Sequence, residues 1–132
     1  MNTTLEQERA KFALEKVKDW EKKDSEEYYR YIVQLPVMIR NNGLGQSLAF
    51  LLAKKKPSCE DIYGAIEEWL VNKRKIYKNV GNDNKTSLIE LLIKGDRIQY
   101  SHAQQETLTF FNWLKIFADA FLKKEFLKKE NE

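Results

Sequence analysis

The sequence predicts an all-α fold, a single compact bundle of about six helices that ends in a long C-terminal helix. Apolar residues recur at helical spacing in segment after segment, and no segment shows the strict alternation of a half-buried strand. Residues 96–132 contain neither glycine nor proline, so one long helix is expected there. With 132 residues, 42% of them hydrophobic, the chain is expected to form a single domain over residues 1–132.

The first two helices have clear start signals. Thr4 and Gln7 have the spacing of a capping box, and an apolar stripe at helical spacing follows as far as Trp20. Ser25 opens the second helix, since two glutamates lie in its first turn, where they favour the helix dipole. Pro36 lies within the apolar stripe of this helix, and because proline removes a backbone donor, a kink or an early end is expected there.

A turn and a short helix are expected next. Residues 41–43, Asn-Asn-Gly, suit the left-handed backbone found at helix C-termini. The third helix should cover residues 45–55 and face inward through four leucines, Leu44, Leu48, Leu51 and Leu52.

Three more helices complete the prediction. Ser58, followed by two acids, is expected to be the N-cap of the fourth helix, and residues 81–84 form a loop after it. The fifth helix covers residues 86–94 and is closed by Gly95, and Asp96 caps the sixth. The last helix is apolar nearly all round in its middle, which predicts burial on several sides. Its expected core residues are Trp113, Leu114, Phe117 and Phe121, packed against Leu35, Ile39 and Leu48.

The chain offers few groups for catalysis or metal binding. It has one histidine and one cysteine, far apart in sequence, and metal sites and catalytic triads need more. The single Cys59 excludes an internal disulfide, and the first residues lack a signal peptide, so a cytoplasmic protein is expected. The most apolar window, residues 108–122, contains polar and charged side chains, so no membrane-spanning segment is expected. No cofactor, no metal, no membrane and no small-molecule substrate is expected.

One pair of residues supports an alternative function. Arg97 and His102 lie at the start of the last helix and resemble the R-x4-6-H motif of helical HEPN-type ribonucleases. That resemblance implies a histidine acting as general base on the RNA 2′-hydroxyl and an arginine stabilising the phosphorane. Those enzymes usually have a polar residue directly after the arginine, where this chain has Ile98. A small HEPN-like ribonuclease is therefore the alternative hypothesis.

The charge distribution favours nucleic-acid binding. Residues 30–58 carry five basic side chains and no acidic one, whereas residues 1–29 carry six basic and eight acidic ones and residues 59–132 carry twelve of each. The formal surplus of +3 therefore arises in one segment. Such a segment is either a buried helical hairpin with few charges or a face kept positive for phosphates.

Two basic triplets and one polar turn are the candidate contacts. Cations near helix C-termini also favour the helix dipole, which explains part of their placement, but that effect does not require three in a row. An arginine and an amide beside a turn can bind a phosphate or a base edge. The predicted nucleic-acid-binding residues are Arg40, Asn42, Lys54, Lys55, Lys56, Lys73, Arg74 and Lys75.

Several sequence blocks together resemble one family. They are LEQERA at residues 5–10, Leu35-Pro36, NGLGQ at residues 42–46 with LAFL at residues 48–51, then Tyr100, Glu106 and Leu108, and FFNWLK at residues 110–115. These blocks resemble the small helical subunit of the type III-B CRISPR RNA-silencing (Cmr) complex. They lie in roughly the first 53 and the last 37 residues. Where relatives often place a second basic residue after Lys115, this chain has Ile116.

The resemblance implies a non-catalytic role in antiviral defence. A few copies of such a subunit stack beside the backbone subunits that hold the guide RNA, and they line the path of the paired target strand. The implied partners are the backbone and large Cmr subunits, copies of the chain itself, and the guide RNA/target RNA duplex. Weak RNA binding by the isolated chain is expected, because affinity then comes from assembly.

Overall fold

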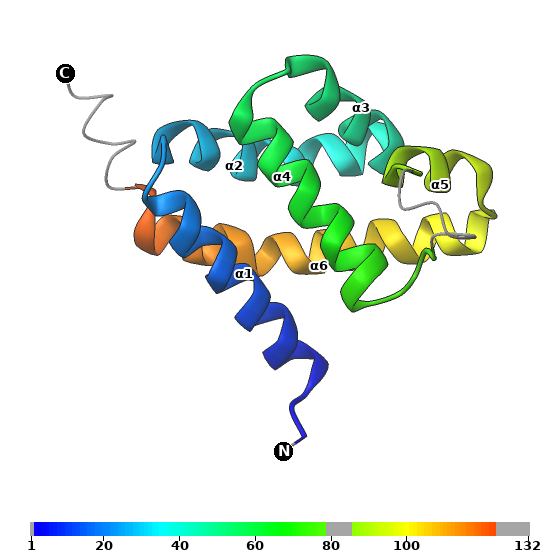
Figure 1. Cartoon of the computed structure of the whole chain (residues 1–132), viewed down its shortest axis with the longest axis horizontal. Coiled ribbons are helices and arrows are strands. Elements are labelled where there is room, and N and C mark those ends of the chain that lie inside the picture. The colour runs from blue at the N-terminus through cyan, green and yellow to red at the C-terminus, as the bar shows by residue number, and fades with distance from the viewer. Residues whose placement is uncertain (1, 79–85, 124–132) are drawn as a thin grey trace. The chain divides into compact units, whose positions relative to one another are not determined.

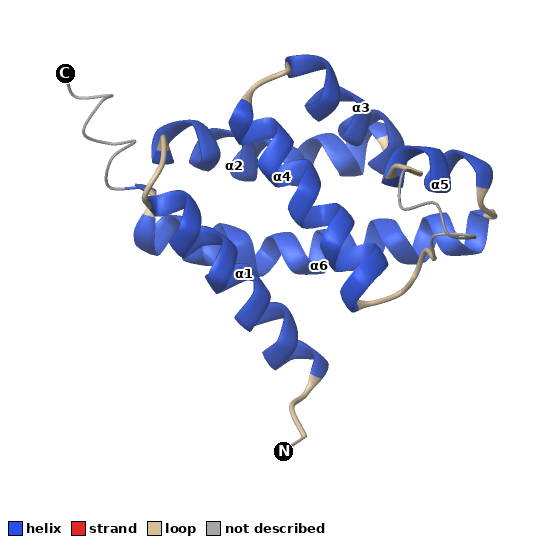
Figure 2. Cartoon of the chain, in the orientation of Figure 1, coloured by secondary structure: helices blue, strands red, loops and turns tan. Residues whose placement is uncertain are grey.

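The computed structural model describes residues 2–78 and 86–123, and within these ranges the chain is all-α (Figures 1 and 2). No strand occurs in the described residues, and the C-terminal helix is the longest, so the predicted fold class is confirmed. The elements are α1 (Leu5–Glu21), α2 (Ser25–Asn42), α3 (Leu44–Lys54), α4 (Pro57–Glu67), a π-helical segment η1 (Glu68–Lys73), α5 (Leu88–Lys94) and α6 (Arg97–Phe121).

The chain divides into two compact units. Unit 1 comprises the residues up to Pro36 and those from Thr109 onward, and unit 2 comprises Val37–Leu108. The division therefore falls within α2 and within α6. Helix α2 does not end at Pro36, as the sequence allowed, but continues to Asn42. The prediction of one domain over residues 1–132 stays a prediction.

Unit 1 is held together by aromatic side chains. The predicted capping box of α1 is present, since Thr4 Oγ1 accepts from the Gln7 amide across 3.0 Å and Gln7 Oε1 accepts from the Thr4 amide across 2.8 Å. The rings of Phe12 and Phe110 lie 5.5 Å apart between α1 and α6. Trp20 and Tyr28 stack across the turn between α1 and α2, with ring centroids 5.2 Å apart, and both are buried.

The buried side of α6 in unit 1 differs in part from the prediction. Leu114 is buried, but Trp113, Phe117 and Phe121 are only partly buried, so the prediction of these three as core residues is wrong. Because this helix is apolar on more than one side, its periodicity does not distinguish the core stripe from the next one. The buried residues of this stretch are Phe110, Phe111, Leu114, Ala118 and Leu122.

A partly buried hydrogen bond joins α2 to α6 within unit 1. The Tyr29 hydroxyl donates to Asp119 Oδ1 across 2.9 Å. Burial, and next the hydrogen bond to this carboxylate and its charge, raise the pKa of Tyr29 to about 12. The hydroxyl therefore remains protonated far above neutral pH.

Unit 2 is built on α3, which packs against both α4 and α5 (Figure 1). Three of the four predicted inward leucines are fully buried, Leu44, Leu48 and Leu51. The fourth, Leu52, is 42% exposed, so its prediction is wrong. It lies about 100° around the helix from Leu51, at the edge of the buried stripe.

The helix ends of unit 2 follow the predicted signals with one exception. Helix α4 begins at Pro57, whose missing N–H is harmless at a first helical position, and its N-cap is Lys56. Ser58 is therefore not the N-cap. Asp96 Oδ1 accepts from the Gln99 amide across 2.8 Å and caps α6 as predicted. The predicted loop at residues 81–84 lies outside the described residues.

Candidate nucleic-acid interface

The predicted nucleic-acid-binding residues lie at three helix ends of unit 2. Arg40 and Asn42 are in the last turn of α2, directly before α3. The triplet Lys54–Lys56 forms the corner between α3 and α4. The triplet Lys73–Lys75 ends η1. Because α4 and η1 contain 11 and 6 residues, the two triplets are separated by about 25 Å of helix. That all of them share one surface stays a prediction.

These basic side chains differ in whether they interact with other residues of the same chain. Lys54 Nζ lies 5.1 Å from the centroid of the Phe50 ring, a cation–π distance. Lys56 and Lys73 are exposed and also take part in interactions within the chain. Of the predicted contacts, the cations that are exposed and have no partner among the described residues are Arg40, Lys55 and Lys75.

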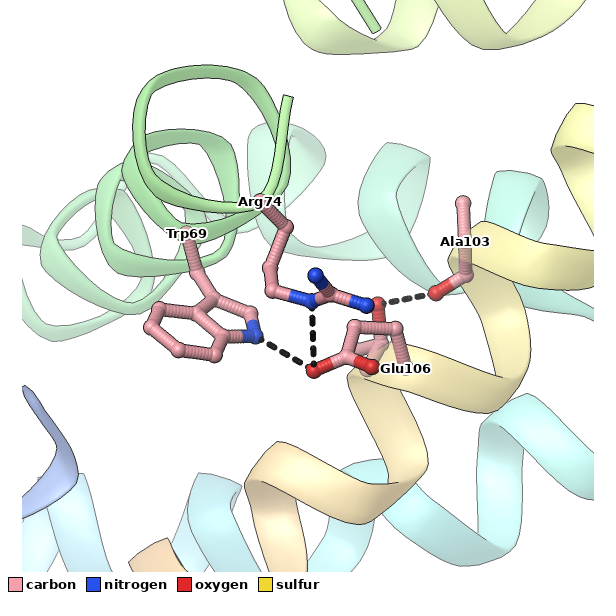
Figure 3. Close-up of polar contacts among 5 residues, drawn as sticks. Trp69, Arg74, Ala103 and Glu106 are labelled. Carbon is pink, nitrogen blue, oxygen red and sulfur yellow. Dashed lines mark hydrogen bonds and ion pairs between the residues drawn. The ribbon is translucent and has the colours of Figure 1, made fainter. Parts of the chain in front are cut away.

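Arg74 has a partner inside unit 2 (Figure 3). Its Nε lies 3.5 Å from Oε1 of Glu106, whose side chain is 4% exposed. That separation forms an ion pair but is too long for a well-formed hydrogen bond. The same carboxylate oxygen accepts from Trp69 Nε1 across 3.0 Å. Glu106 thus joins α6 to η1 through two side chains.

The π-helical turn directs Arg74 inward. The Arg74 amide donates to the Trp69 carbonyl across 2.8 Å, a bond to the fifth residue back instead of the fourth. The wider turn places Arg74 toward Glu106, while Lys73 and Lys75 remain exposed. The triplet therefore has two lysines exposed to solvent, and its arginine is held inside unit 2 by the ion pair with Glu106. That Arg74 also contacts nucleic acid stays a prediction.

Sequence reasoning did not identify Glu106 as the partner of Arg74. The available signal was its register on α6, since Ala103, Glu106, Thr107 and Phe110 form one stripe at helical spacing and all are buried. A carboxylate at a core position of such a stripe requires a partner, because an unpaired buried charge is costly. The nearby Thr107 hydroxyl is satisfied by the Ala103 carbonyl across 2.7 Å.

The amides at the start of α3 are bound by side chains from α6. The Leu44 amide donates to Gln104 Oε1 and the Gly45 amide donates to the Tyr100 hydroxyl, each across 2.9 Å. Gly43 has a φ of 90°, and a Cβ there would lie 2.9 Å from the Tyr100 hydroxyl. Position 43 therefore requires glycine, because its φ is positive and because a Cβ would be too close to the Tyr100 hydroxyl. These amides serve packing of unit 2 and are not open to a phosphate.

Arg97 and His102 do not contact each other in the described part of the chain. Both are exposed on α6. Five residues apart on a helix, they lie about 140° from each other around the axis. The described residues contain no group of three metal-ligating side chains. Within the same residues, no helix has the length and apolar character that crossing a membrane needs.

Comparison with known proteins identifies the family. The family model described as "CRISPR-associated protein (Cas_Cmr5)" matches residues 5–121. The chain belongs to the Cmr5 family. The matched range includes residues 54–95, where the sequence blocks showed no family motif. The resemblance stated from those blocks is thereby confirmed.

Two comparisons, one of sequence and one of structure, each match a Cmr5 protein from Thermus thermophilus over nearly its whole length. The CRISPR system Cmr subunit Cmr5 of that organism is 28% identical over 115 residues, which cover 86% of this chain and 92% of the relative. The crystal structure of a CRISPR-associated Cmr5 family protein from the same organism matches with a TM-score of 0.70 and 26% identity, covering 91% of this chain and 99% of that one.

Proposed function

We propose that the chain is a non-catalytic small subunit of a type III-B CRISPR (Cmr) ribonucleoprotein effector. It stacks beside the guide-bearing backbone and lines the path of the target RNA through a basic face. Membership of the Cmr5 family supports the complex, since the curated relative is named as a Cmr subunit. The proposed partners are the backbone and large Cmr subunits, copies of the chain, and the guide RNA/target RNA duplex, in the cytoplasm.

The proposal that the chain binds RNA is supported mainly by exposed cations that have no partner within the described residues. Arg40, Lys55 and Lys75 are exposed at three helix ends and have no partner among the described residues. Unpaired cations at such ends attract phosphates without reading sequence. Lys54, Lys56, Lys73 and the Asn42 amide add to the same proposed face, and Arg74 anchors it through Glu106.

The proposal of a non-catalytic role rests on the placement of the alternative catalytic pair. A histidine acting as base and an arginine acting on the phosphate must converge on one scissile bond. Arg97 and His102 are both exposed on α6, lie about 140° apart around its axis and do not contact each other in the described part of the chain. No observation favours the ribonuclease hypothesis, which becomes an outcome of the test below.

The test combines RNA binding with RNA cleavage by the purified full chain. Binding of a fluorescent single-stranded RNA is measured for the wild type and for the triple variant Lys54→Glu, Lys55→Glu and Lys56→Glu. The matched control changes three exposed lysines of unit 1, Lys11→Glu, Lys22→Glu and Lys23→Glu, which alters the net charge equally. The first variant should weaken binding by at least about tenfold relative to this control.

Cleavage is measured on the same RNA with the wild type and with His102→Ala. The proposal predicts no cleavage by either protein. RNA degradation by the wild type that His102→Ala abolishes would contradict the proposal in favour of a ribonuclease. Equal binding by the two triple variants would contradict the proposed RNA face.

A further inference from the structure

Two lysines in the basic triplets have an unfavourable backbone conformation. Lys55 and Lys75 each have a φ of 54°, and they are the non-glycine residues with positive φ in the described part of the chain. A Cβ is poorly tolerated in this left-handed region, which favours glycine and, less strongly, asparagine. Lys55 is the C-cap of α3, a type of position that glycine commonly occupies. The chain thus has lysine at two places where glycine is less strained.

In each triplet, the lysine with the left-handed backbone is also the residue whose side chain has no partner among the described residues. In the first triplet, Lys54 lies over the Phe50 ring and Lys56 interacts within the chain. In the second, Arg74 pairs with Glu106 and Lys73 interacts within the chain. Lys55 and Lys75 are exposed and have no partner among the described residues. The Ile76 amide donates to the Leu70 carbonyl across 2.9 Å, a helix-terminating bond that accounts for the left-handed backbone at Lys75. Glycine at this position would allow the same bond, and no side-chain contact in the described chain explains lysine at either position.

Attraction to the helix dipole accounts for a cation near each helix end, but not for its left-handed backbone. Lys54 and Lys73 already place a cation in the last turns of α3 and η1 with helical backbone. A further lysine in the left-handed region gains little from the same dipole, whose effect is confined to the last turn. Residues with a strained backbone cluster at sites that bind ligands.

We propose that Lys55 and Lys75 are the two principal phosphate contacts of the RNA face, one at each end of the rod formed by α4 and η1. The proposal rests on the proposed RNA-binding function and names the residues that carry it. The rod separates the two lysines by about 25 Å. Successive phosphates of a duplex strand lie only a few ångströms apart along its axis, so the two contacts are separated by several phosphates.

The proposal predicts opposite effects of one substitution on stability and on binding. Lys55→Gly and Lys75→Gly remove the strain, so each should raise the Tm of the full chain by about 2–6 °C. Each should also lower RNA affinity by about three- to tenfold and flatten the dependence of log K on log salt by about 0.7–0.9. Lys55→Asn and Lys75→Asn test the same positions with a side chain that tolerates this backbone.

The probes are RNA hairpins with stems of about four and about ten base pairs, since only the longer stem spans both lysines. Wild-type protein should bind the longer stem more tightly. Either glycine variant should lose most of that gain, while the charge control Lys11→Ala on α1 should keep it. These results, together with the higher Tm, would establish the two lysines as paired phosphate contacts.

Two results separate this inference from the proposed function. If the triple glutamate variant weakens RNA binding while both glycine variants bind like Lys11→Ala, the RNA face stands and the assignment of Lys55 and Lys75 is wrong. If the triple glutamate variant binds like its own control, the RNA face itself is wrong. A fall in Tm for both glycine variants would show that the left-handed lysines are not strained and would overturn the argument for them.

Discussion

The Gly45 amide donates a hydrogen bond to the Tyr100 hydroxyl across 2.9 Å, which ties the first turn of α3 to a side chain 55 residues away on α6. The first amides of a helix have no partner within the helix. Here a tyrosine and, one residue earlier, Gln104 provide the acceptors. Two sequence blocks that resembled the Cmr subunit, the glycine-containing block and Tyr100, are thus parts of one contact within unit 2.

Removing this hydroxyl should destabilise the fold without enlarging a cavity. Tyr100→Phe leaves the Gly45 amide without its acceptor, and loss of a helix cap of this kind costs about 1 kcal/mol. The free energy of unfolding in urea measures the loss. Ser101→Ala, at an exposed neighbouring position, is the control. A Tyr100→Phe value within error of that control would show that the hydrogen bond contributes nothing.

Glu106 should be the most sensitive polar residue of unit 2. Glu106→Ala leaves the partly buried Arg74 guanidinium and the buried Trp69 indole N–H without their carboxylate. Breaking a buried pair in this way costs about 3–5 kcal/mol. A double-mutant cycle with Arg74→Ala in urea isolates the pair, because the two losses should be far from additive. Additive losses would mean that the ion pair is energetically silent.

The two stripes of α6 in unit 1 should respond differently to truncation. Phe110 is fully buried, so Phe110→Ala should cost about 3–5 kcal/mol. Trp113 is only partly buried and stacks on Phe117 with ring centroids 5.6 Å apart. Trp113→Ala should cost less than about 2 kcal/mol, since less of its surface leaves water on folding. Chemical unfolding gives both values, and a larger loss at Trp113 would refute the assignment of stripes.

Alkaline pH should weaken unit 1 through Tyr29. Its pKa in the folded state is raised to about 12, above the value near 10 of an unfolded tyrosine. Between these values the unfolded chain releases a proton that the folded chain keeps, so the contribution is complete below pH 10 and is lost as pH rises toward 12.

The test compares wild type with Tyr29→Phe by urea unfolding at several pH values. Because phenylalanine has no proton to lose, the stability difference between the two proteins should shrink as pH rises from about 9 to about 12. A difference that stays constant over this range would contradict the raised pKa of Tyr29. Lysines titrate in both proteins alike, so their contribution cancels in the comparison.

Local signals predicted the helices well, because caps are set by residues three apart. Thr4 with Gln7 and Asp96 with Gln99 pair as their spacing indicated. Choices between neighbouring stripes needed tertiary contacts, and the predictions for Leu52, Trp113, Phe117 and Phe121 were wrong for that reason. Pro57 displaced the start of α4, which removed Ser58 from the cap.

The candidate site was predictable in position but not in detail. The acid-free segment and the two triplets located the exposed cations. The pairing of Arg74 depends on a π-helical turn and on a carboxylate from another helix, neither of which leaves a signal near residue 74. The left-handed backbone of Lys55 and Lys75 is equally invisible to composition, because lysine is not a residue that marks such turns.

The salt dependence of RNA binding by the full chain tests most directly that exposed cations of unit 2 contact phosphates. Engagement of about five phosphates on single-stranded RNA predicts a slope of log K against log salt near −3.5, at about 0.7 per contact. Replacing Lys54, Lys55 and Lys56 by glutamate should bring the slope to about −1.4. An unchanged slope in this variant, or a wild-type slope near zero, would contradict an RNA face at these residues.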